Sequence, residues 1–225
     1  MMKLKTENAG RMYFRGSGNK NYFYAVKAAD FSLEEGCITV ITGSSGSGKT
    51  TFINMLSGLL APSEGRVFVD ERDMYSLTDK ERSLLRNRSF GIIPQGQTGL
   101  QCLTVSENVL LPAVMYGRAD EKKHQAKELL EKTGIAELWN IYSNELSGGE
   151  LRRMSVARAL INDPAVIIAD EPTGDLDGEA TSLVMELLSE RAKNGASVLI
   201  VTHDSEVLPY ADRVFSMEKG VLKKI

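Results

Sequence analysis

Short runs of β-branched and aromatic residues alternate with stretches of helical hydrophobic spacing along the chain. Residues 22–42 mix such residues with a Glu-Glu-Gly turn, and they predict strands, of which the last is short and buried. A Gly-rich loop follows directly. Residues 51–60 then place apolar side chains such as Phe52 and Met55 at helical spacing. The order strand, Gly-rich loop, helix is the βα unit of an α/β fold.

The middle of the chain has a different pattern. Between about residues 97 and 160, charged residues intersperse with Leu and Ala and strand signals are sparse. Strand-type runs return at residues 166–169 and 198–202, and the helix-like stretch between them ends near Gly195. The pattern therefore predicts a helical lobe inserted into an α/β protein.

We expect one domain over residues 1–225. Its α/β core is predicted to comprise residues 1–96 and 161–225, and its helical subdomain residues 97–160. A chain of 225 residues with 42% apolar side chains can bury a substantial core.

The composition of the chain indicates which kinds of partner and which cellular compartment to expect. The chain has 27 basic and 30 acidic residues, a net charge of −3, which does not indicate a nucleic-acid partner. No apolar run approaches the roughly 20 residues of a membrane-spanning helix, and the first residues lack a signal peptide's apolar core. If the function is transport, another chain must form the pathway. Cys37 and Cys102 lie far apart, which predicts buried, reduced thiols in a reducing cytoplasm.

Residues 43–50 read GSSGSGKT and match the phosphate-loop pattern G-x4-G-K-[ST], with a strand before it and a helix after it. Glycines let successive backbone N–H groups point at phosphate oxygens, and the following helix adds its positive end. Lys49 is then the point charge for the β and γ phosphates, and Thr50 offers its hydroxyl to Mg²⁺. Thr51 either contacts a phosphate or caps the helix.

A second apolar strand ends in two acids. Residues 166–169 precede Asp170 and Glu171, which therefore stand at the carboxyl end of the strand, where open α/β sheets bind ligands. Asp170 can hold Mg²⁺, and Glu171 is placed to orient and deprotonate an attacking water. These two motifs alone leave kinases, GTPases and ATPases open.

A third motif separates these classes. Leu146, Ser147, Gly148, Gly149 and Glu150 open a helical stretch and so form another phosphate-binding helix terminus. This element, between the phosphate loop and the carboxylate strand, resembles the signature of the ATP-binding cassette family. Glu150 stands where the family often has Gln, which adds a negative charge near the signature.

The resemblance extends over nearly the whole chain. Gln95 resembles the family's Q-loop residue, which touches Mg²⁺ and the attacking water, and Asp177 lies in a stretch that resembles the D-loop. His203 resembles the switch histidine that contacts the γ-phosphate, and Tyr13, upstream of the first predicted strands, resembles the aromatic that stacks on adenine. The segment at residues 96–99 is more glycine-rich than usual where the family contacts its permease.

The resemblance implies a P-loop NTPase (RecA-like) core with an antiparallel β subdomain and an inserted α-helical subdomain. It implies ATP and Mg²⁺ as cofactors, with Glu171, His203, Gln95 and Lys49 catalytic and Thr50, Gln95 and Asp170 at the metal. The residues implied at the nucleotide are Tyr13, Gly43, Ser44, Ser45, Gly46, Ser47, Gly48, Lys49, Thr50, Thr51, Ser147, Gly148, Gly149 and Asp177.

The partners follow from the same resemblance. It implies a head-to-tail homodimer around two ATP molecules that drives a separate integral membrane permease from the cytoplasmic face of the membrane. Residues 104–112 and 172–177 are similar to the lipoprotein-release, macrolide-export and cell-division branch. An importer or conventional exporter subunit, a soluble cassette ATPase acting on ribosomes or DNA, and a small-molecule P-loop kinase are the alternatives. The kinase leaves the Leu-Ser-Gly-Gly element and His203 unexplained.

Overall fold

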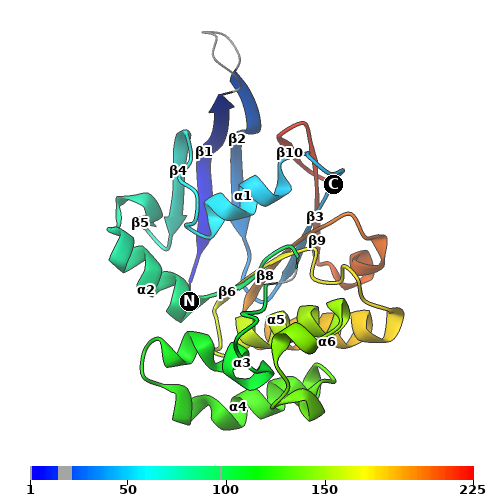
Figure 1. The fold of residues 1–225 in the computed structure, drawn as a ribbon. Coiled ribbons are helices and arrows are strands. Elements are labelled where there is room, and N and C mark those ends of the chain that lie inside the picture. The colour runs from blue at the N-terminus through cyan, green and yellow to red at the C-terminus, as the bar shows by residue number, and fades with distance from the viewer. Residues whose placement is uncertain (1, 15–21, 97) are drawn as a thin grey trace.

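The fold combines two sheets with two groups of helices (Figure 1). The computed structural model describes residues 2–14, 22–96 and 98–225. The strands are β1 (Leu4–Phe14), β2 (Tyr22–Leu33), β3 (Ile38–Thr42), β4 (Glu64–Val69), β5 (Arg72–Asp73), β6 (Phe90–Ile93), β7 (Val166–Asp170), β8 (Ser197–Thr202), β9 (Arg213–Glu218) and β10 (Val221–Lys224). The α-helices are α1 (Lys49–Leu56), α2 (Asp79–Ser89), α3 (Val105–Val114), α4 (Ala119–Lys132), α5 (Gly148–Leu160) and α6 (Gly178–Lys193). Short 3-10 helices are η1 (Met74–Ser76), η2 (Ala136–Leu138), η3 (Ser143–Glu145) and η4 (Ser205–Tyr210).

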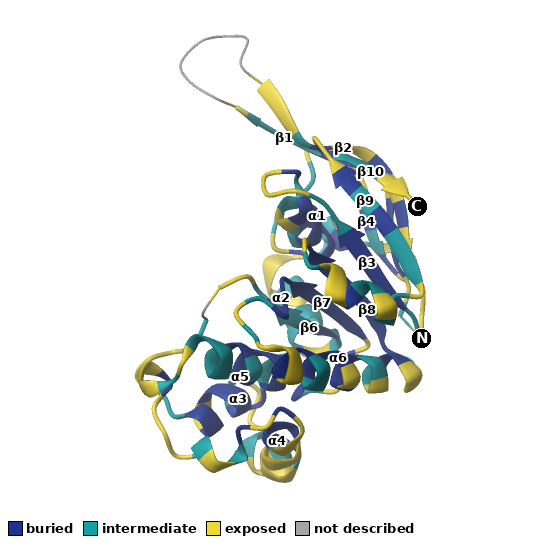
Figure 2. Cartoon of the chain, turned by 90° about the vertical axis from the view of Figure 1, so that its right-hand side faces the viewer, coloured by how far each residue is buried: buried dark blue, intermediate teal, exposed yellow. Residues whose placement is uncertain are grey.

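The larger sheet has the strand order β10-β9-β3-β8-β7-β6. Neighbouring strands from β9 to β6 run parallel, and only β10 is antiparallel. Side chains alternate between two buried clusters: Ile167 and Ala169 pack with α5 and α6, whereas Val166 and Ile168 pack with α1 and the smaller sheet. Because both faces are covered, β7 and β8 are buried along their whole length (Figure 2).

The smaller sheet is antiparallel, with the order β2-β1-β4-β5. Tyr13 lies within β1 and pairs with Phe23 of β2. The expectation that Tyr13 lies upstream of the first strands is therefore wrong: the alternation in residues 4–14 is interrupted by register shifts between Thr6 and Met12, which hide the strand in the sequence.

Helices α3, α4 and α5 pack against one another, and α5 also packs on one face of the large sheet (Figure 1). Thr104 caps α3 and Ser147 caps α5, each in a capping box with the Glu three residues later. All three helices lie inside residues 97–160, although the subdomain boundaries themselves stay a prediction. None of the helices in the described residues has the length and hydrophobicity needed to cross a bilayer.

Two local expectations are corrected. The helix predicted to reach Leu60 ends at Leu56, because Gly58 adopts a left-handed φ of 73° and turns the chain. The thiols were expected to be buried, but Cys102 is exposed and Cys37 only partly buried. Cys102 sits in the turn before α3, where the backbone runs over the surface.

Candidate active site

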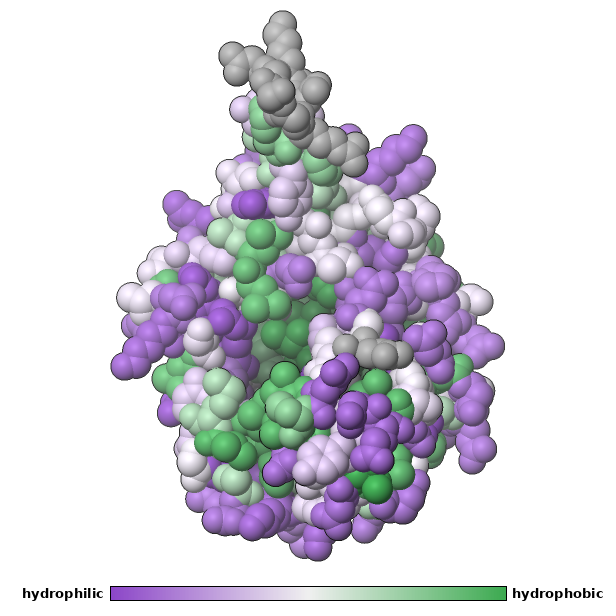
Figure 3. Space-filling view, in the orientation of Figure 1, coloured by the Kyte–Doolittle hydropathy of each residue, from purple (hydrophilic) through white to green (hydrophobic). Residues whose placement is uncertain are grey.

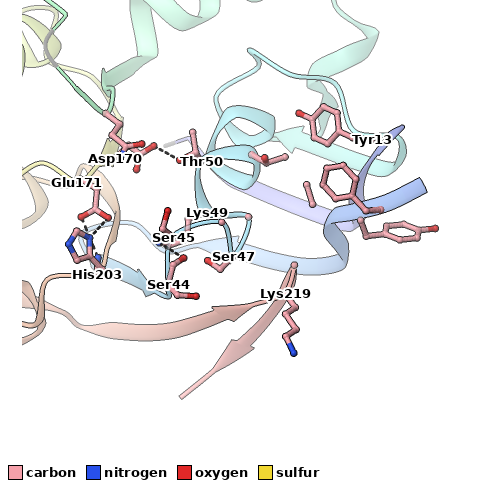
Figure 4. A pocket seen from close by; sticks show the side chains of 18 residues that line it. Tyr13, Ser44, Ser45, Ser47, Lys49, Thr50, Asp170, Glu171, His203 and Lys219 are labelled. Carbon is pink, nitrogen blue, oxygen red and sulfur yellow. Dashed lines mark hydrogen bonds and ion pairs between the residues drawn. The ribbon is translucent and has the colours of Figure 1, made fainter. Parts of the chain in front are cut away.

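Four neighbouring parallel strands bring the predicted chemistry to one edge of the large sheet. The phosphate loop follows β3, Asp170 ends β7 and Glu171 follows it, Gln95 comes after β6, and His203 follows β8. Carboxyl ends of parallel strands share one edge, so these groups meet although they are far apart in sequence. They line a pocket of about 780 Å³ (Figure 4). Its lining comprises Tyr13, Phe23, Tyr24, Ala25, Ser44, Ser45, Gly46, Ser47, Gly48, Lys49, Thr50, Thr51, Gln95, Asp170, Glu171, His203, Lys219 and Gly220.

The phosphate loop wraps the start of α1. Gly48 stands directly before the helix with φ 111°, and a Cβ there would lie 2.1 Å from the carbonyl oxygen of Ala25. Only glycine fits this position, because it combines a left-handed φ with close backbone approach. The first N–H groups of α1 are therefore directed at the pocket, which suits a phosphate.

Two polar side chains of the loop fit an anion. The Lys49 ammonium is nearly buried and donates hydrogen bonds to the carbonyl oxygens of Gly43 (2.6 Å) and Ser44 (3.2 Å). The Ser47 hydroxyl is buried and has no hydrogen-bond partner among the described residues. A buried hydroxyl without a partner is costly unless a ligand satisfies it, so a phosphate oxygen fits here.

Thr50 joins the phosphate loop to the acidic strand. Its hydroxyl donates a 2.7 Å hydrogen bond to Oδ2 of Asp170. Burial raises the pKa of Asp170, and the hydrogen bond from Thr50 acts in the opposite direction. A hydroxyl beside one carboxylate is an oxygen set that suits Mg²⁺, which takes one or two protein oxygens and completes its shell with phosphate and water.

Glu171 is held in an unusual backbone conformation. Its φ is 51°, which is uncommon for a residue with a Cβ, and its amide donates to the carbonyl oxygen of Val201 at 2.8 Å. This turn points the carboxylate away from the strand axis and into the pocket (Figure 4). The Glu171 side chain is 11% exposed. It accepts hydrogen bonds from the hydroxyl of Thr202, which ends β8, and from the backbone amide of His203.

His203 faces Glu171 across the end of β8. Its Nδ1 lies 2.7 Å from Oε1 of Glu171, while its ring is 75% exposed. Because an ionised carboxylate can only accept, Nδ1–H is the donor in this contact when Glu171 is ionised. His203 and Glu171 both line the pocket, where they form a hydrogen-bonded pair.

An aromatic surface borders the far end of the pocket. Tyr13 and Phe23 stack with ring centroids 5.8 Å apart, and the Arg11 guanidinium lies 4.9 Å from the Tyr13 centroid. Tyr13 and Phe23 line the pocket together with Tyr24. Only Tyr13 was predicted; the cross-strand pairing with Phe23 is the signal that could have identified its partner.

Five predicted residues do not line this pocket. Ser147, Gly148 and Gly149 begin α5 in the helical part of the chain, and Asp177 caps α6 by accepting a 2.8 Å hydrogen bond from the amide of Ala180. Gly43 also lies outside the lining, at the start of the loop. One copy of the chain therefore gathers the phosphate loop, acids, glutamine and histidine, but leaves the signature elsewhere.

Glu150 now has a structural explanation. Its Oε2 accepts hydrogen bonds of 2.7 Å from both the amide and the hydroxyl of Ser147, and its own amide donates to the Ser147 hydroxyl at 3.3 Å. These hydrogen bonds lower the pKa of Glu150. The acid at this position thus closes a capping box that fixes the signature serine.

Arg152 is a charged residue that sequence reasoning missed. It is 5% exposed, lies on α5, and donates a 2.8 Å hydrogen bond to the carbonyl oxygen of Pro94, next to Gln95. Burial lowers the pKa of its guanidinium, and the carboxylates of Asp175, Asp170 and Glu171 act in the opposite direction. Nothing in the local sequence distinguishes Arg152 from Arg153, so only the structure identifies it.

A phosphate loop at the head of a helix, with an acidic pair on a neighbouring parallel strand, defines a P-loop nucleoside triphosphatase. Comparison with known proteins gives the family. Residues 26–174 match the family model described as ABC transporter. The ABC transporter ATP-binding protein YtrE of Bacillus subtilis is 38% identical over 208 residues, covering 92% of this chain and 90% of that protein.

Two further relatives and two solved structures agree with this family. The lipoprotein-releasing system ATP-binding protein LolD of Saccharophagus degradans is 38% identical, covering 88% of each chain. The macrolide export ATP-binding/permease protein MacB of Aggregatibacter actinomycetemcomitans is 39% identical, but the match covers 92% of this chain and only 32% of MacB. Dimeric MJ0796, described as a bacterial ABC transporter cassette, has a TM-score of 0.91 and 33% identity over 98% of each chain. Its dimeric post-hydrolysis state bound to ADP and Pi has a TM-score of 0.90 and 32% identity.

The chain therefore belongs to the ABC transporter family and is one of its ATP-binding, ATP-hydrolysing subunits. The predicted fold class, an α/β P-loop core with an antiparallel sheet and additional helices, is confirmed. The family assignment, drawn from residues 43–50 and 146–150, and the prediction of an ATPase that uses ATP are confirmed as well.

Proposed function

We propose that two copies of this chain form a head-to-tail dimer that hydrolyses two Mg²⁺-bound ATP molecules and drives a separate membrane permease. One observation supports the proposed dimer: the residues that line the pocket do not include Ser147, Gly148 or Gly149. Gly148 and Gly149 form the first turn of α5, where backbone N–H groups suit a phosphate, yet all three residues lie outside the pocket that contains the phosphate loop of their own chain. A second copy can supply them, which makes each site composite.

The residue roles follow from their places in the pocket. Lys49 and the loop amides bind the β and γ phosphates, and Tyr13 contacts the base. Thr50, Asp170 and Gln95 hold Mg²⁺, which when bound offsets phosphate charge. Glu171 accepts the proton of the attacking water, and His203 contacts the γ-phosphate.

The opposite subunit supplies the remaining groups. The signature loop at residues 147–149 binds the γ-phosphate from the far side, and Asp177 lies in the segment of the partner that approaches it. Hydrolysis and phosphate release then reopen the dimer and reset the permease.

The dimer is tested with Glu171→Gln, which should bind ATP, fail to hydrolyse it, and elute as a dimer in light-scattering chromatography only when ATP is present. Adding Ser147→Arg to this variant should leave ATP binding within about twofold but abolish the dimer, because a bulky cation replaces the signature serine. Asn144→Arg places the same charge on an exposed residue three positions earlier and should dimerise normally. A dimer that survives Ser147→Arg would contradict the composite site.

An apolar groove supports a permease partner. Helix α3 ends at Val114, and Met115 and Tyr116 follow it; the three side chains are 50%, 69% and 40% exposed. Met115 and Tyr116 line a groove of about 320 Å³ together with residues of α2, β6 and α5. Figure 3 shows hydrophobic surface around a hollow on the face that carries β6 and α3. Exposed apolar clusters of this kind mark protein interaction sites. A short helix of a permease of the lipoprotein-release or macrolide-export type is the proposed occupant, which places the chain on the cytoplasmic face of the membrane.

Co-isolation tests this partner. Tagged chain, purified from gently solubilised native membranes, should carry a permease in stoichiometric amount, and Met115→Glu should lose it while keeping ATP binding. Ile225→Glu, a second exposed apolar position remote from the groove, should keep the permease. Recovery with ribosomes or DNA alone would instead support the soluble ATPase, and a permease coupled to a substrate-binding protein would support the importer.

A further inference from the structure

Thr202 is a buried residue of the site that the roles above leave unused. It is the last residue of β8, is fully buried, and lies beside Thr42 of β3, where the phosphate loop begins. Its hydroxyl has two hydrogen-bond partners: the amide of Asp204 at 2.9 Å and Oε2 of Glu171 at 2.7 Å. The buried Thr202 hydroxyl therefore makes hydrogen bonds to protein groups on both sides.

The direction of both hydrogen bonds is fixed by chemistry. The amide of Asp204 can only donate, so it occupies a lone pair of the Thr202 hydroxyl. The one hydroxyl proton is left for Glu171, and an ionised carboxylate can only accept. Thr202 is therefore a donor to Oε2, and such charge-assisted hydrogen bonds are stronger than neutral ones.

This donor makes the two oxygens of Glu171 unequal. Oε2 accepts from the Thr202 hydroxyl and, at 3.3 Å, from the amide of His203. Among the described residues, the hydrogen-bond partner of Oε1 is the His203 ring, which is largely exposed and lines the pocket. Oε1 is consequently the oxygen that can meet a water molecule once the imidazole turns toward a nucleotide.

The turn that follows Thr202 is also hydrogen-bonded to the segment that follows Glu171. The Thr173 hydroxyl donates a 3.0 Å hydrogen bond to Oδ2 of Asp204, and the amide of Asp204 donates to Thr202. Because Thr173 follows Glu171 by two residues, the hydrogen bonds form a closed ring between the ends of β7 and β8. The ring keeps Thr202 at a fixed distance from the carboxylate.

We infer that Thr202 is a positioning residue for hydrolysis, which fixes Oε2 of Glu171 so that Oε1 is aimed at the attacking water. The inference rests on the proposed role of Glu171 as the base. Thr202 does not touch the nucleotide, so its loss should affect turnover and leave ATP binding intact. Orientation of a base within hydrogen-bond reach is what general-base catalysis requires.

The test compares three buried hydroxyl substitutions by kcat and KM for ATP. Thr202→Val removes the donor at nearly constant volume and should lower kcat roughly tenfold or more with KM within about twofold, the rate equivalent of one hydrogen bond to a charged group. Thr202→Ser keeps the donor and should restore kcat to within about threefold. Thr39→Val is the matched control, since Thr39 is equally buried on the neighbouring strand β3 and its hydroxyl has no partner among the described residues.

The possible results distinguish the role of Glu171 as the base from the role of Thr202 in positioning it. If Glu171→Gln abolishes turnover but Thr202→Val keeps wild-type kcat, Glu171 stands as the base and the role of Thr202 is overturned. A Thr202→Ser variant as slow as Thr202→Val, or a Thr39→Val variant equally slow, would also overturn it, because shape rather than the donor would then matter. Full turnover by Glu171→Gln would overturn both.

Discussion

The hydroxyl of Thr50 donates a 2.7 Å hydrogen bond to Oδ2 of Asp170, although 120 residues separate them in the chain. The contact joins the start of α1 to the end of β7 and sets the two oxygens side by side at the pocket. It brings together the two residues that sequence motifs assign to Mg²⁺. The proposed metal site is thus organised by the chain itself.

Asp170→Asn should remove Mg²⁺-dependent hydrolysis, with kcat lowered at least about a hundredfold, because the neutral amide attracts a divalent cation poorly. ATP affinity measured in EDTA should stay within about twofold of wild type, since the phosphate loop is unchanged. Titration calorimetry with ATP at several Mg²⁺ concentrations checks both. An unchanged Mg²⁺ dependence would remove Asp170 from the metal site.

Lys49→Ala should weaken ATP binding by about a hundredfold. The Lys49 ammonium donates hydrogen bonds to the carbonyl oxygens of Gly43 and Ser44 and supplies the positive charge for the phosphates. Lys219→Ala is the control: Lys219 lines the same pocket but is exposed and extends away from it (Figure 4), so ATP affinity should change less than about threefold. Equal losses in the two variants would show that charge around the pocket, rather than the position of Lys49, determines binding.

Tyr13→Ala should lower ATP affinity roughly tenfold, because stacking on an aromatic ring contributes about 1–3 kcal/mol per base. Binding of inorganic tripolyphosphate, which has no base, should not change. Phe14→Ala, at the next position and outside the pocket lining, should bind ATP as wild type does. If Tyr13→Ala weakens tripolyphosphate as much as ATP, the tyrosine supports the fold and does not contact the base.

Glu150→Gln tests the capping box of the signature helix through pH. The hydrogen bonds from Ser147 lower the pKa of Glu150 in the folded chain, so its contribution to stability is present above the ordinary glutamate pKa of about 4.3 and is lost as pH falls through the lower folded value. Between pH 5 and pH 3, wild type should therefore lose more thermal stability than Glu150→Gln. Identical pH dependences of the melting temperature would contradict the capping box.

The sequence was most informative where chemistry demands fixed spacing. Residues 43–50 have one arrangement that cradles phosphate, and an apolar strand ending in Asp170 and Glu171 can bring its acids only to the ligand edge of a parallel sheet. For this reason the core fold and the main pocket could be predicted. The family resemblance added Gln95 and His203, and both line the pocket.

Features that depend on tertiary packing escaped prediction. Strand β1 carries register shifts that break its alternation, so Tyr13 could not be placed on a strand. Arg152 and Thr202 owe their burial and partners to segments about 58 and 31 residues distant, and no local pattern marks them. The exposure of Cys102 likewise depends on how the turn before α3 lies on the surface.

Steady-state ATP hydrolysis by Glu171→Gln, with ATP affinity determined on the same preparation, tests most directly whether Glu171 is the base of this site. Turnover should fall by about a hundredfold or more, since the amide cannot accept the proton of water, while ATP affinity should stay at or above that of wild type. Turnover near the wild-type rate with intact ATP binding would contradict this role and would require another base in this site.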